Sequence, residues 1–160
     1  GVDLNRCWID PSRKMQPTVY HYKMMVKKLQ EDRDIFLVLD LHGHSRKKNI
    51  FCYGNSGRPN DRFKERIFPS LLDKNSDLFN IEDCNFAVQK SKESTMRVVM
   101  WKELGITNTF TCEASFCGPD IGKFADYHFN QDLLQEMGHR ICDTILDFCD
   151  PDQVKVRQIL

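Results

Sequence analysis

An apolar run over 35–39 leads directly into the polar segment DLHGH (40–44), and this stretch constrains the fold more than any other. The run is rich in branched residues and too short for an independent helix, which favours a strand over 35–41 that is buried on both faces of a parallel or mixed sheet. A histidine that directly follows such a strand lies at the carboxyl edge of the sheet, where open α/β folds build their sites. His42 is therefore a candidate metal ligand.

The rest of the chain alternates helical and extended patterns. Apolar residues at steps of three and four predict a helix over 17–32, which Pro17 opens, and a last helix over 130–149 with Leu133, Leu134, Met137, Ile141, Ile145, Leu146 and Phe148 on one face. Between them the sequence predicts a short strand over 49–53, a surface loop over 54–61, a helical segment over 63–72 interrupted at Pro69, a strand around Phe86 and Val88, a helix over 96–104 capped by Gly105, and a strand over 106–112 with Phe110 inward. This order predicts an α/β fold with a mixed sheet flanked by helices.

Length and composition limit the chain to one core. Its 160 residues, 41% hydrophobic, do not suffice for two independent domains. Lys and Arg balance Asp and Glu at 23 each, so no overall field favours nucleic acid or an anionic membrane. Residues 42–102 carry 12 Lys and Arg against 7 Asp and Glu, which suits either an acidic substrate or an ordinary solvated surface. Nucleic-acid binding through these cations is disfavoured because aromatic residues are not interleaved with them.

The seven cysteines form an odd set without any CxxC pair, and no signal peptide precedes them. Several lie in apolar surroundings, so we interpret them as reduced thiols of a cytosolic protein. No apolar stretch approaches the roughly 20 residues of a membrane span. The chain starts at Gly1 inside a polar motif and is expected to be a fragment.

Glu113 ends the predicted strand 106–112, as His42 follows the first strand. If the two strands are neighbours, both side chains meet at one edge of the sheet, and a glutamate near a metal-bound water is a general base. The alternative is a solvated or salt-bridged carboxylate. His44 is expected to point to the opposite side and is not assigned to the metal, and His21, His128 and His139 are expected on the surface or in packing contacts.

Three further residues are candidates for binding a substrate. Arg6 is able to hold a carboxylate through two parallel hydrogen bonds while Asn5 donates a third, although such a pair in a loop is equally typical of plain surface groups. Arg97 begins an apolar run, so its stem is expected to be buried and its guanidinium to point into an interior space. Two interpretations remain open for Arg97: a pocket that selects an acidic side chain, or an ion pair with a neighbouring acid.

Four motifs in this order carry a family resemblance: DLNR (3–6), DLHGHSRKKN (40–49), RVVMWK (97–102) and CEASFCG (112–118). Over nearly its whole length the chain resembles the zinc metallocarboxypeptidases, and among them the cytosolic carboxypeptidases that remove glutamates from tubulin. The resemblance implies that His42 is the third zinc ligand and Glu113 the general base. It further implies that Asn5 and Arg6 bind the terminal carboxylate and that Arg97 faces the side chain of a leaving glutamate.

The family takes its first two zinc ligands from a His-x-x-Glu motif upstream of DLNR, and no such motif occurs here. A further arginine of the family also lies upstream, and its substrate-capping tyrosine has no counterpart that spacing identifies. Residues 1–160 therefore resemble the C-terminal part of one catalytic domain, which alone should hold zinc weakly, turn over no substrate and leave a sheet edge exposed.

The function implied for the parent protein is zinc-dependent removal of C-terminal or side-chain glutamates from proteins such as tubulin, in the cytoplasm and in association with microtubules or cilia. Glutamate-rich protein tails are the expected partners, without nucleic acid or membrane. The alternative is a non-catalytic module that binds acidic protein tails through its basic middle. Replacing Glu113 with glutamine separates the two, since only an enzyme loses glutamate release.

Overall fold

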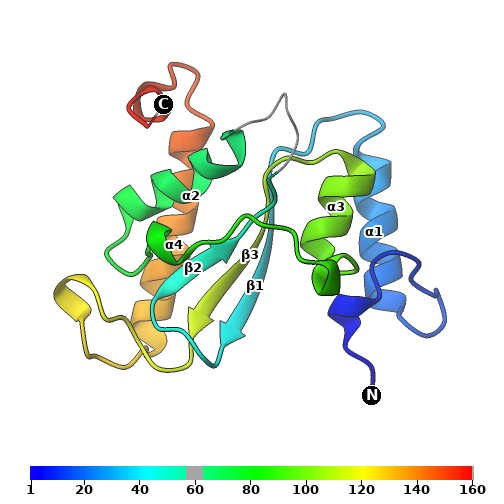
Figure 1. Cartoon of the computed structure of the whole chain (residues 1–160). Helices are drawn as coiled ribbons and strands as arrows, with labels where there is room; N and C mark the ends of the chain where they lie inside the picture. The colour runs from blue at the N-terminus through cyan, green and yellow to red at the C-terminus, as the bar shows by residue number, and fades with distance from the viewer. Residues whose placement is uncertain (57–62, 160) are drawn as a thin grey trace.

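A computed structural model describes residues 1–56 and 63–159, which form a mixed three-stranded sheet flanked by helices (Figure 1). The strands are β1 (Val38–His44), β2 (Ile50–Tyr53) and β3 (Thr109–Ser115) in the order β1-β3-β2, with β1 parallel and β2 antiparallel to β3. The helices are α1 (Pro17–Leu29), α2 (Lys64–Asn75), α3 (Met96–Leu104), α4 (Gln131–Phe148) and α5 (Val154–Arg157), with short 3-10 turns η1 (Leu4–Arg6), η3 (Ile81–Asp83), η4 (Lys90–Lys92) and η5 (Gly122–Phe124). The predicted α/β class is confirmed.

The sequence of β3 gives the sheet two chemically different faces. Phe110 and Cys112 are buried in the apolar core against α2 and α4. Thr111 and Glu113 point to the other face, because side chains alternate along a strand, and both line a pocket there. One face of the sheet therefore holds the fold together while the other is available for chemistry.

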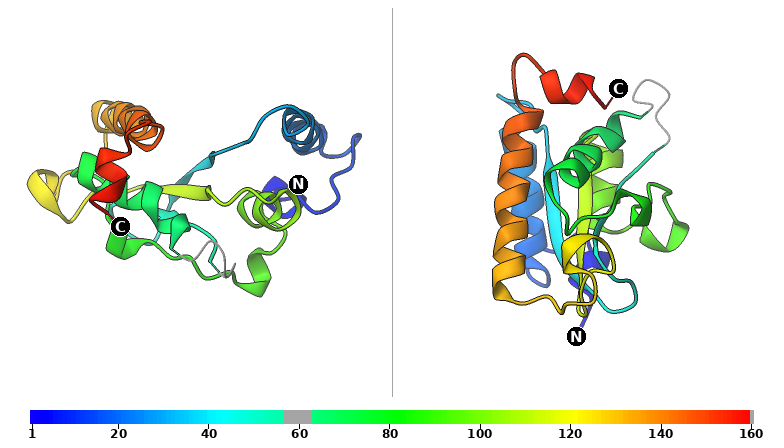
Figure 2. Two further views of the ribbon diagram at one scale, coloured as in Figure 1. Left: turned by 90° about the horizontal axis from the view of Figure 1, so that it is seen from above. Right: turned by 90° about the vertical axis from the view of Figure 1, so that its left-hand side faces the viewer.

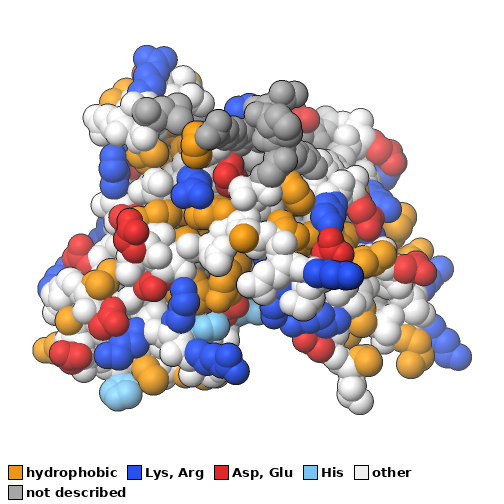
Figure 3. Space-filling model, in the orientation of Figure 1, with side chains coloured by type: hydrophobic (Ala, Val, Ile, Leu, Met, Phe, Trp, Pro, Cys, Tyr) orange, Lys and Arg blue, Asp and Glu red, His pale blue; other side chains and the backbone are white. Residues whose placement is uncertain are grey.

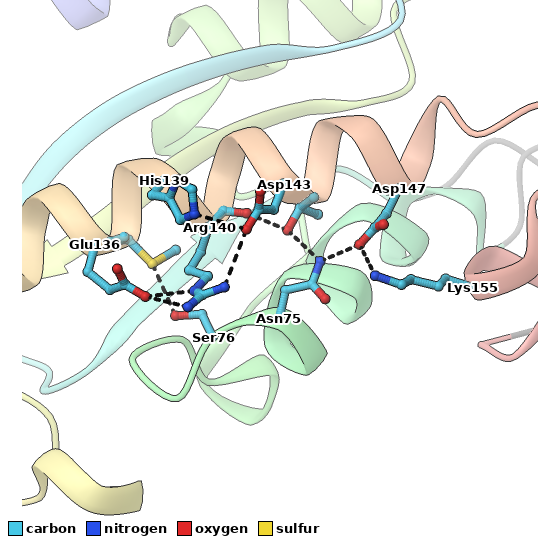
Figure 4. A network of polar contacts seen from close by, with 10 residues as sticks. Asn75, Ser76, Glu136, His139, Arg140, Asp143, Asp147 and Lys155 are labelled. Carbon is cyan, nitrogen blue, oxygen red and sulfur yellow. Dashed lines mark hydrogen bonds and ion pairs between the residues drawn. The ribbon is translucent and has the colours of Figure 1, made fainter.

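The larger core lies between the sheet and the helices α2 and α4, which run next to each other on the left of Figure 1 and are also seen in Figure 2. A polar network ties the two helices together (Figure 4). Asn75 Nδ2 donates to Thr144 Oγ1 at 3.1 Å and to Asp147 Oδ2 at 2.7 Å, and Lys155 Nζ also binds Asp147 Oδ2 at 2.7 Å. This network anchors α5 to the end of α4.

A second core lies under α1 and α3, on the right of Figure 1, and includes Val26, Val38 and Val99. Lys23 is buried here with its charge satisfied: Nζ donates to the carbonyls of Trp8 and Ile9 at 2.9 and 2.8 Å and pairs with Glu103 Oε2 at 2.6 Å. These contacts fix the segment that follows η1 against both helices, and η1 carries two of the candidate site residues.

The first strand differs from its prediction. β1 begins at Val38 and continues through His44, so His42 lies inside the strand and does not follow it. The strand is also not buried on both faces, since Leu41 is 68% exposed. Within the described part of the chain β1 pairs only with β3, which leaves the expected free edge.

Three other predicted elements need correction. No strand forms around Phe86 and Val88, where only Asn85 makes an isolated bridge to Tyr53. Instead, the Phe86 carbonyl accepts from the Ser56 backbone at 2.8 Å, and the Phe86 ring is buried in the core. The first helix ends at Leu29, and the last strand is displaced to 109–115, so Glu113 lies within it.

The helix α2 continues through Pro69 and is not interrupted there. A proline inside a helix costs about 3 kcal/mol because it removes one hydrogen bond and clashes with the preceding turn. The neighbouring Phe68, Leu71 and Leu72 are each at most 1% exposed, and full burial of such side chains contributes about 1.5–3 kcal/mol apiece. Packing therefore outweighs the local penalty.

The helices α3 and α4 confirm most of their predicted features. Gly105 caps α3 with a φ of 75°, and Met137, Ile141 and Ile145 of α4 pack on the sheet. Leu134 and Leu146 do not share that face and are exposed. All seven cysteines are free thiols. Among the described residues, no helix combines the length and the apolar character that crossing a membrane requires.

Candidate active site

A pocket of about 420 Å³ opens on the polar face of the sheet, next to the carboxyl ends of β1 and β3. All five site residues predicted from the sequence line it: Asn5, Arg6, His42, Arg97 and Glu113. In the space-filling view the surface has a notch at its lower edge, with histidine and basic side chains beside it (Figure 3). Residues more than 100 positions apart in the sequence are thus gathered at one place.

His42 and Glu113 are direct partners in the parallel register of β1 and β3. Partnered residues in adjacent strands project to the same face, so the candidate metal ligand and the candidate base point to the same side of the sheet. The sequence predicted this meeting only on condition that the two strands are neighbours, and that condition is fulfilled.

The imidazole of His42 is oriented by its neighbours. Its Nε2 lies 2.9 Å from Asp40 Oδ2, and Asn5 Nδ2 donates to the same oxygen at 3.2 Å. Asn5 is itself fixed, because its Oδ1 accepts from the backbone of Met96 at the start of α3 at 2.9 Å. With Nε2 engaged by a carboxylate, the lone pair of His42 that remains for a metal is on Nδ1.

Glu113 is 8% exposed, and its Oε2 has no hydrogen-bond partner among the described residues. The ring of His44 approaches this oxygen, with Nδ1 3.6 Å away. Burial raises the pKa of Glu113, and Asp40 adds to the rise, whereas His42, His44 and Lys92 oppose it. A buried carboxylate with a raised pKa and a free oxygen suits an acceptor of protons.

The prediction that His44 points to the side opposite His42 is wrong. His44 lies on the same side as His42 and approaches Glu113, because side chains two residues apart in a strand share a face. Its ring packs edge-to-face on Phe51 of β2, with the ring centroids 5.1 Å apart. His44 therefore belongs to the surroundings of Glu113.

Arg6 lies at the exposed rim of the pocket. Its Nη1 donates to the carbonyl of Asn5 at 2.9 Å and lies 3.6 Å from Asp3 Oδ2. The two contacts engage one nitrogen of the guanidinium, which keeps further N–H donors for an incoming carboxylate.

Arg97 is 5% exposed and lies in the wall of the pocket. Its Nη1 donates to Asn55 Oδ1 at 2.8 Å and to the carbonyl of Gly54. Within 1–56 and 63–159 no carboxylate forms an ion pair with it, so the alternative of a neighbouring acid finds no support. Burial lowers the pKa of Arg97 to about 10, and Tyr53 opposes that shift. A buried cation held only by neutral acceptors favours an anionic ligand.

Asn55 supports the Arg97 side chain, and its loss should destabilise the protein. Its Nδ2 also donates to Thr109 Oγ1 at 2.8 Å, so alanine leaves several buried polar groups unpaired. We expect Asn55→Ala to lower the free energy of unfolding by about 1–3 kcal/mol in urea denaturation. The matched control is Gln135→Ala on the exposed side of α4. Equal small effects of both variants would contradict the role of Asn55.

The sequence did not single out Tyr53 or Lys92, which also line the pocket. Tyr53 pairs with Thr111 in the β2–β3 register, two positions from Glu113, so it shares the polar face of the sheet. Burial raises the pKa of Tyr53, and the charge of Glu113 adds to the rise. The sequence of β2 alone does not place Tyr53 here, because its register against β3 decides which β2 side chains face the pocket.

The described residues contain no group of three His, Cys, Asp or Glu side chains placed to hold a metal ion. They do fit one part of such a site. His42 has an oriented ring with a nitrogen available for a metal, and the Glu113 oxygen that has no hydrogen-bond partner among the described residues lies on the same face of the sheet.

No family model matches the chain. It is 48% identical over 166 aligned residues to cytosolic carboxypeptidase 3 of Bos taurus and 47% identical over 162 to cytosolic carboxypeptidase 2 of Mus musculus. Both alignments cover 100% of the chain but only 16% and 19% of those proteins. The chain thus spans less than a fifth of the length of these relatives.

Two solved structures share the fold. A metallo-carboxypeptidase from Pseudomonas aeruginosa, in complex with (2-guanidinoethylmercapto)succinic acid, superposes with a TM-score of 0.79 at 21% identity. A metallo-carboxypeptidase from Burkholderia cenocepacia gives 0.76 at 18% identity. Each match covers 94% of this chain and 40% or 39% of the other, so the fold seen here corresponds to part of those structures.

Proposed function

Since this chain belongs to the cytosolic carboxypeptidase family, we propose that residues 1–160 are the C-terminal part of one zinc carboxypeptidase catalytic domain. The activity proposed for the complete protein is removal of C-terminal or side-chain glutamates from the acidic tails of proteins such as tubulin, in the cytoplasm and at microtubules or cilia. The observation that carries this proposal is the convergence of all five predicted residues on one pocket.

Asn5 and Arg6 bind the free carboxylate at the end of the substrate. Arg6 at the rim offers N–H donors that match a carboxylate, and an enzyme that requires this group at a fixed place removes terminal residues only. Arg97 receives the side chain of the leaving residue. A buried guanidinium without an acidic partner prefers a carboxylate to an apolar group, which gives selectivity for glutamate.

His42 would hold the zinc through Nδ1, with Asp40 fixing the ring, and the other two protein ligands are expected upstream. Bound zinc supplies a water with a pKa near 7 and polarises the scissile carbonyl. Glu113 accepts the proton of the attacking water on its free oxygen and transfers it to the leaving amine. Burial raises the pKa of Glu113, and a carboxylate with a raised pKa is a stronger proton acceptor than an ordinary one.

The free edge of β1 supports the proposal that residues 1–160 are only the C-terminal part of a catalytic domain. Leu41 is 68% and Phe36 44% exposed beside that edge, where an upstream segment would cover them. In the complete protein, Leu41→Asp should lower the free energy of unfolding by about 2 kcal/mol or more, since it buries an unpaired charge. Val154→Asp, at a position 54% exposed on α5, is the control and should change little. Equal tolerance of both variants in chemical denaturation would argue against a covered edge.

The non-catalytic alternative makes the opposite prediction about turnover. The complete protein with zinc should release free glutamate from a glutamate-tailed peptide, and a chelator should abolish the release while peptide binding persists. Binding without release, in protein shown to contain zinc, would favour a module that only holds acidic tails.

A further inference from the structure

The side-chain amide of Asn5 joins two separate walls of the pocket. Its Oδ1 accepts from the backbone N–H of Met96, the first residue of α3, at 2.9 Å. Its Nδ2 donates to Asp40 Oδ2 at 3.2 Å, and His42 Nε2 lies 2.9 Å from the same oxygen. Exchanging the amide oxygen and nitrogen would set an oxygen against the carboxylate and an N–H against an N–H, so both partners fix this orientation.

This series of contacts has its fixed end on α3. The first N–H groups of a helix have no partner inside it, and in the described structure the side chain of the N-cap residue Thr95 does not supply one. Asn5, 91 positions before Met96 in the sequence, supplies the oxygen instead. Met96 is 4% exposed and belongs to the core under α1 and α3, whereas the side chains of Asp40 and His42 are 23% and 33% exposed. Asn5 therefore connects the candidate metal ligand to a well-packed part of the molecule.

The backbone around Asn5 is also held in place. Its N–H donates to Asp3 Oδ1 at 2.9 Å. Just after η1, the backbone of Trp8 donates to the carbonyl of Ser94 at 3.2 Å, in the pocket wall 85–95 that leads into α3. The amide of Asn5 therefore starts from a backbone that is fixed against the same helix.

We propose that Asn5 is a positioning residue for the metal site: it holds Asp40, and through Asp40 the ring of His42, at a fixed place relative to α3. This inference rests on the proposed function and adds a second role to Asn5, because Nδ2 carries another hydrogen for a substrate carboxylate. A partner that orients a ligating histidine affects metal affinity about 10- to 100-fold. Zinc affinity should therefore depend on a residue that does not ligate zinc.

The test measures the zinc affinity of the complete protein by competition with a chromogenic chelator. Asn5→Ala should weaken zinc binding about tenfold. Arg6→Ala is the matched control from the same turn, since its guanidinium contacts Asp3 and the Asn5 carbonyl but neither Asp40 nor His42 among the described residues. It should raise KM for a glutamate-tailed peptide and leave zinc affinity unchanged. Wild-type zinc affinity in folded Asn5→Ala would overturn the inference.

A double-mutant cycle with Asp40→Ala distinguishes positioning from a general effect on the fold. Asp40→Ala should itself weaken zinc binding, because it removes the carboxylate that orients His42. If Asn5 acts through Asp40, adding Asn5→Ala to that variant should cost less than about twofold more, since the two residues then act as one unit. The same loss from Asn5→Ala in both backgrounds would overturn the proposed route.

A measurement on wild-type protein decides the matter if Asn5→Ala does not fold. Coupling between two sites is reciprocal, so zinc should slow hydrogen exchange of the Met96 amide, which donates to Asn5. The effect should exceed that on the Val99 amide of the same helix, which donates to the carbonyl of Thr95. Equal slowing of both would overturn the inference and leave the proposed function intact, whereas wild-type protein that binds no zinc would overturn both.

Discussion

Glu113→Gln should lower glutamate release by at least about 100-fold, because loss of a positioned general base removes that much rate. Glutamine keeps the shape of the side chain and the fold of β3 but accepts no proton. The affinity for a glutamate-tailed peptide should change little, since Asn5, Arg6 and Arg97 remain. Kinetics under saturating zinc, together with peptide binding to the same preparation, measure both quantities. Retained turnover would exclude Glu113 as the base.

The same variant has an expected effect on stability with pH. The folded-state pKa of Glu113 is raised by burial, so the folded state retains the proton at pH values where the unfolded chain has lost it. The free energy of unfolding therefore falls as the pH rises from the ordinary glutamate pKa through the raised pKa of the folded state. The loss persists at neutral pH. In metal-free protein, Glu113→Gln should have the higher melting temperature at neutral pH and no advantage in acid below the ordinary glutamate pKa. A constant difference across pH would contradict this.

Replacing Arg97 should reduce the preference for glutamate-tailed over leucine-tailed peptides by at least about 30-fold, the usual effect of removing one partner of a buried charge pair. Most of the change should be a loss of activity on the glutamate peptide, because the leucine peptide has no carboxylate for the guanidinium. Arg97→Met keeps the buried stem and is measured beside Arg97→Ala. Both variants remove the guanidinium N–H that Asn55 Oδ1 accepts, so they differ only in how much of the stem is lost. An unchanged preference in folded Arg97→Met would overturn the assignment.

The site was more predictable from the sequence than the strands around it. The motifs identified five residues that the structure gathers in one pocket, because each motif combines chemistry with a fixed local backbone. The apolar run 35–39 was misleading because its residues do not all serve one strand. Ile35 packs on the core under α1, Leu37 packs on the core under α2 and α4, and Phe36 stacks on Phe148 with ring centroids 6.1 Å apart. The run is apolar because it joins two cores, and pairing begins only at Val38.

Other features depend on contacts that no local pattern records. Phe86 is buried because it packs in the core, not because it belongs to a strand. Its alternation with Val88 therefore looked like a strand pattern, although neither residue pairs with a neighbouring strand. Tyr53 joins the site through the register of β2 against β3, and Lys92 joins it because the wall 85–95 is tied to the segment after η1. Both placements depend on tertiary contacts, so neither residue was predicted from the sequence.

The proposed function requires a catalytic zinc bound to His42 in this pocket. Crystals of the complete protein, with anomalous diffraction recorded on both sides of the zinc absorption edge, test it most directly. We predict a zinc peak about 2.0–2.1 Å from His42 Nδ1, on the face of the sheet that carries Glu113. A zinc peak away from His42, or a zinc-loaded crystal with this pocket free of metal, would show that His42 is not a zinc ligand.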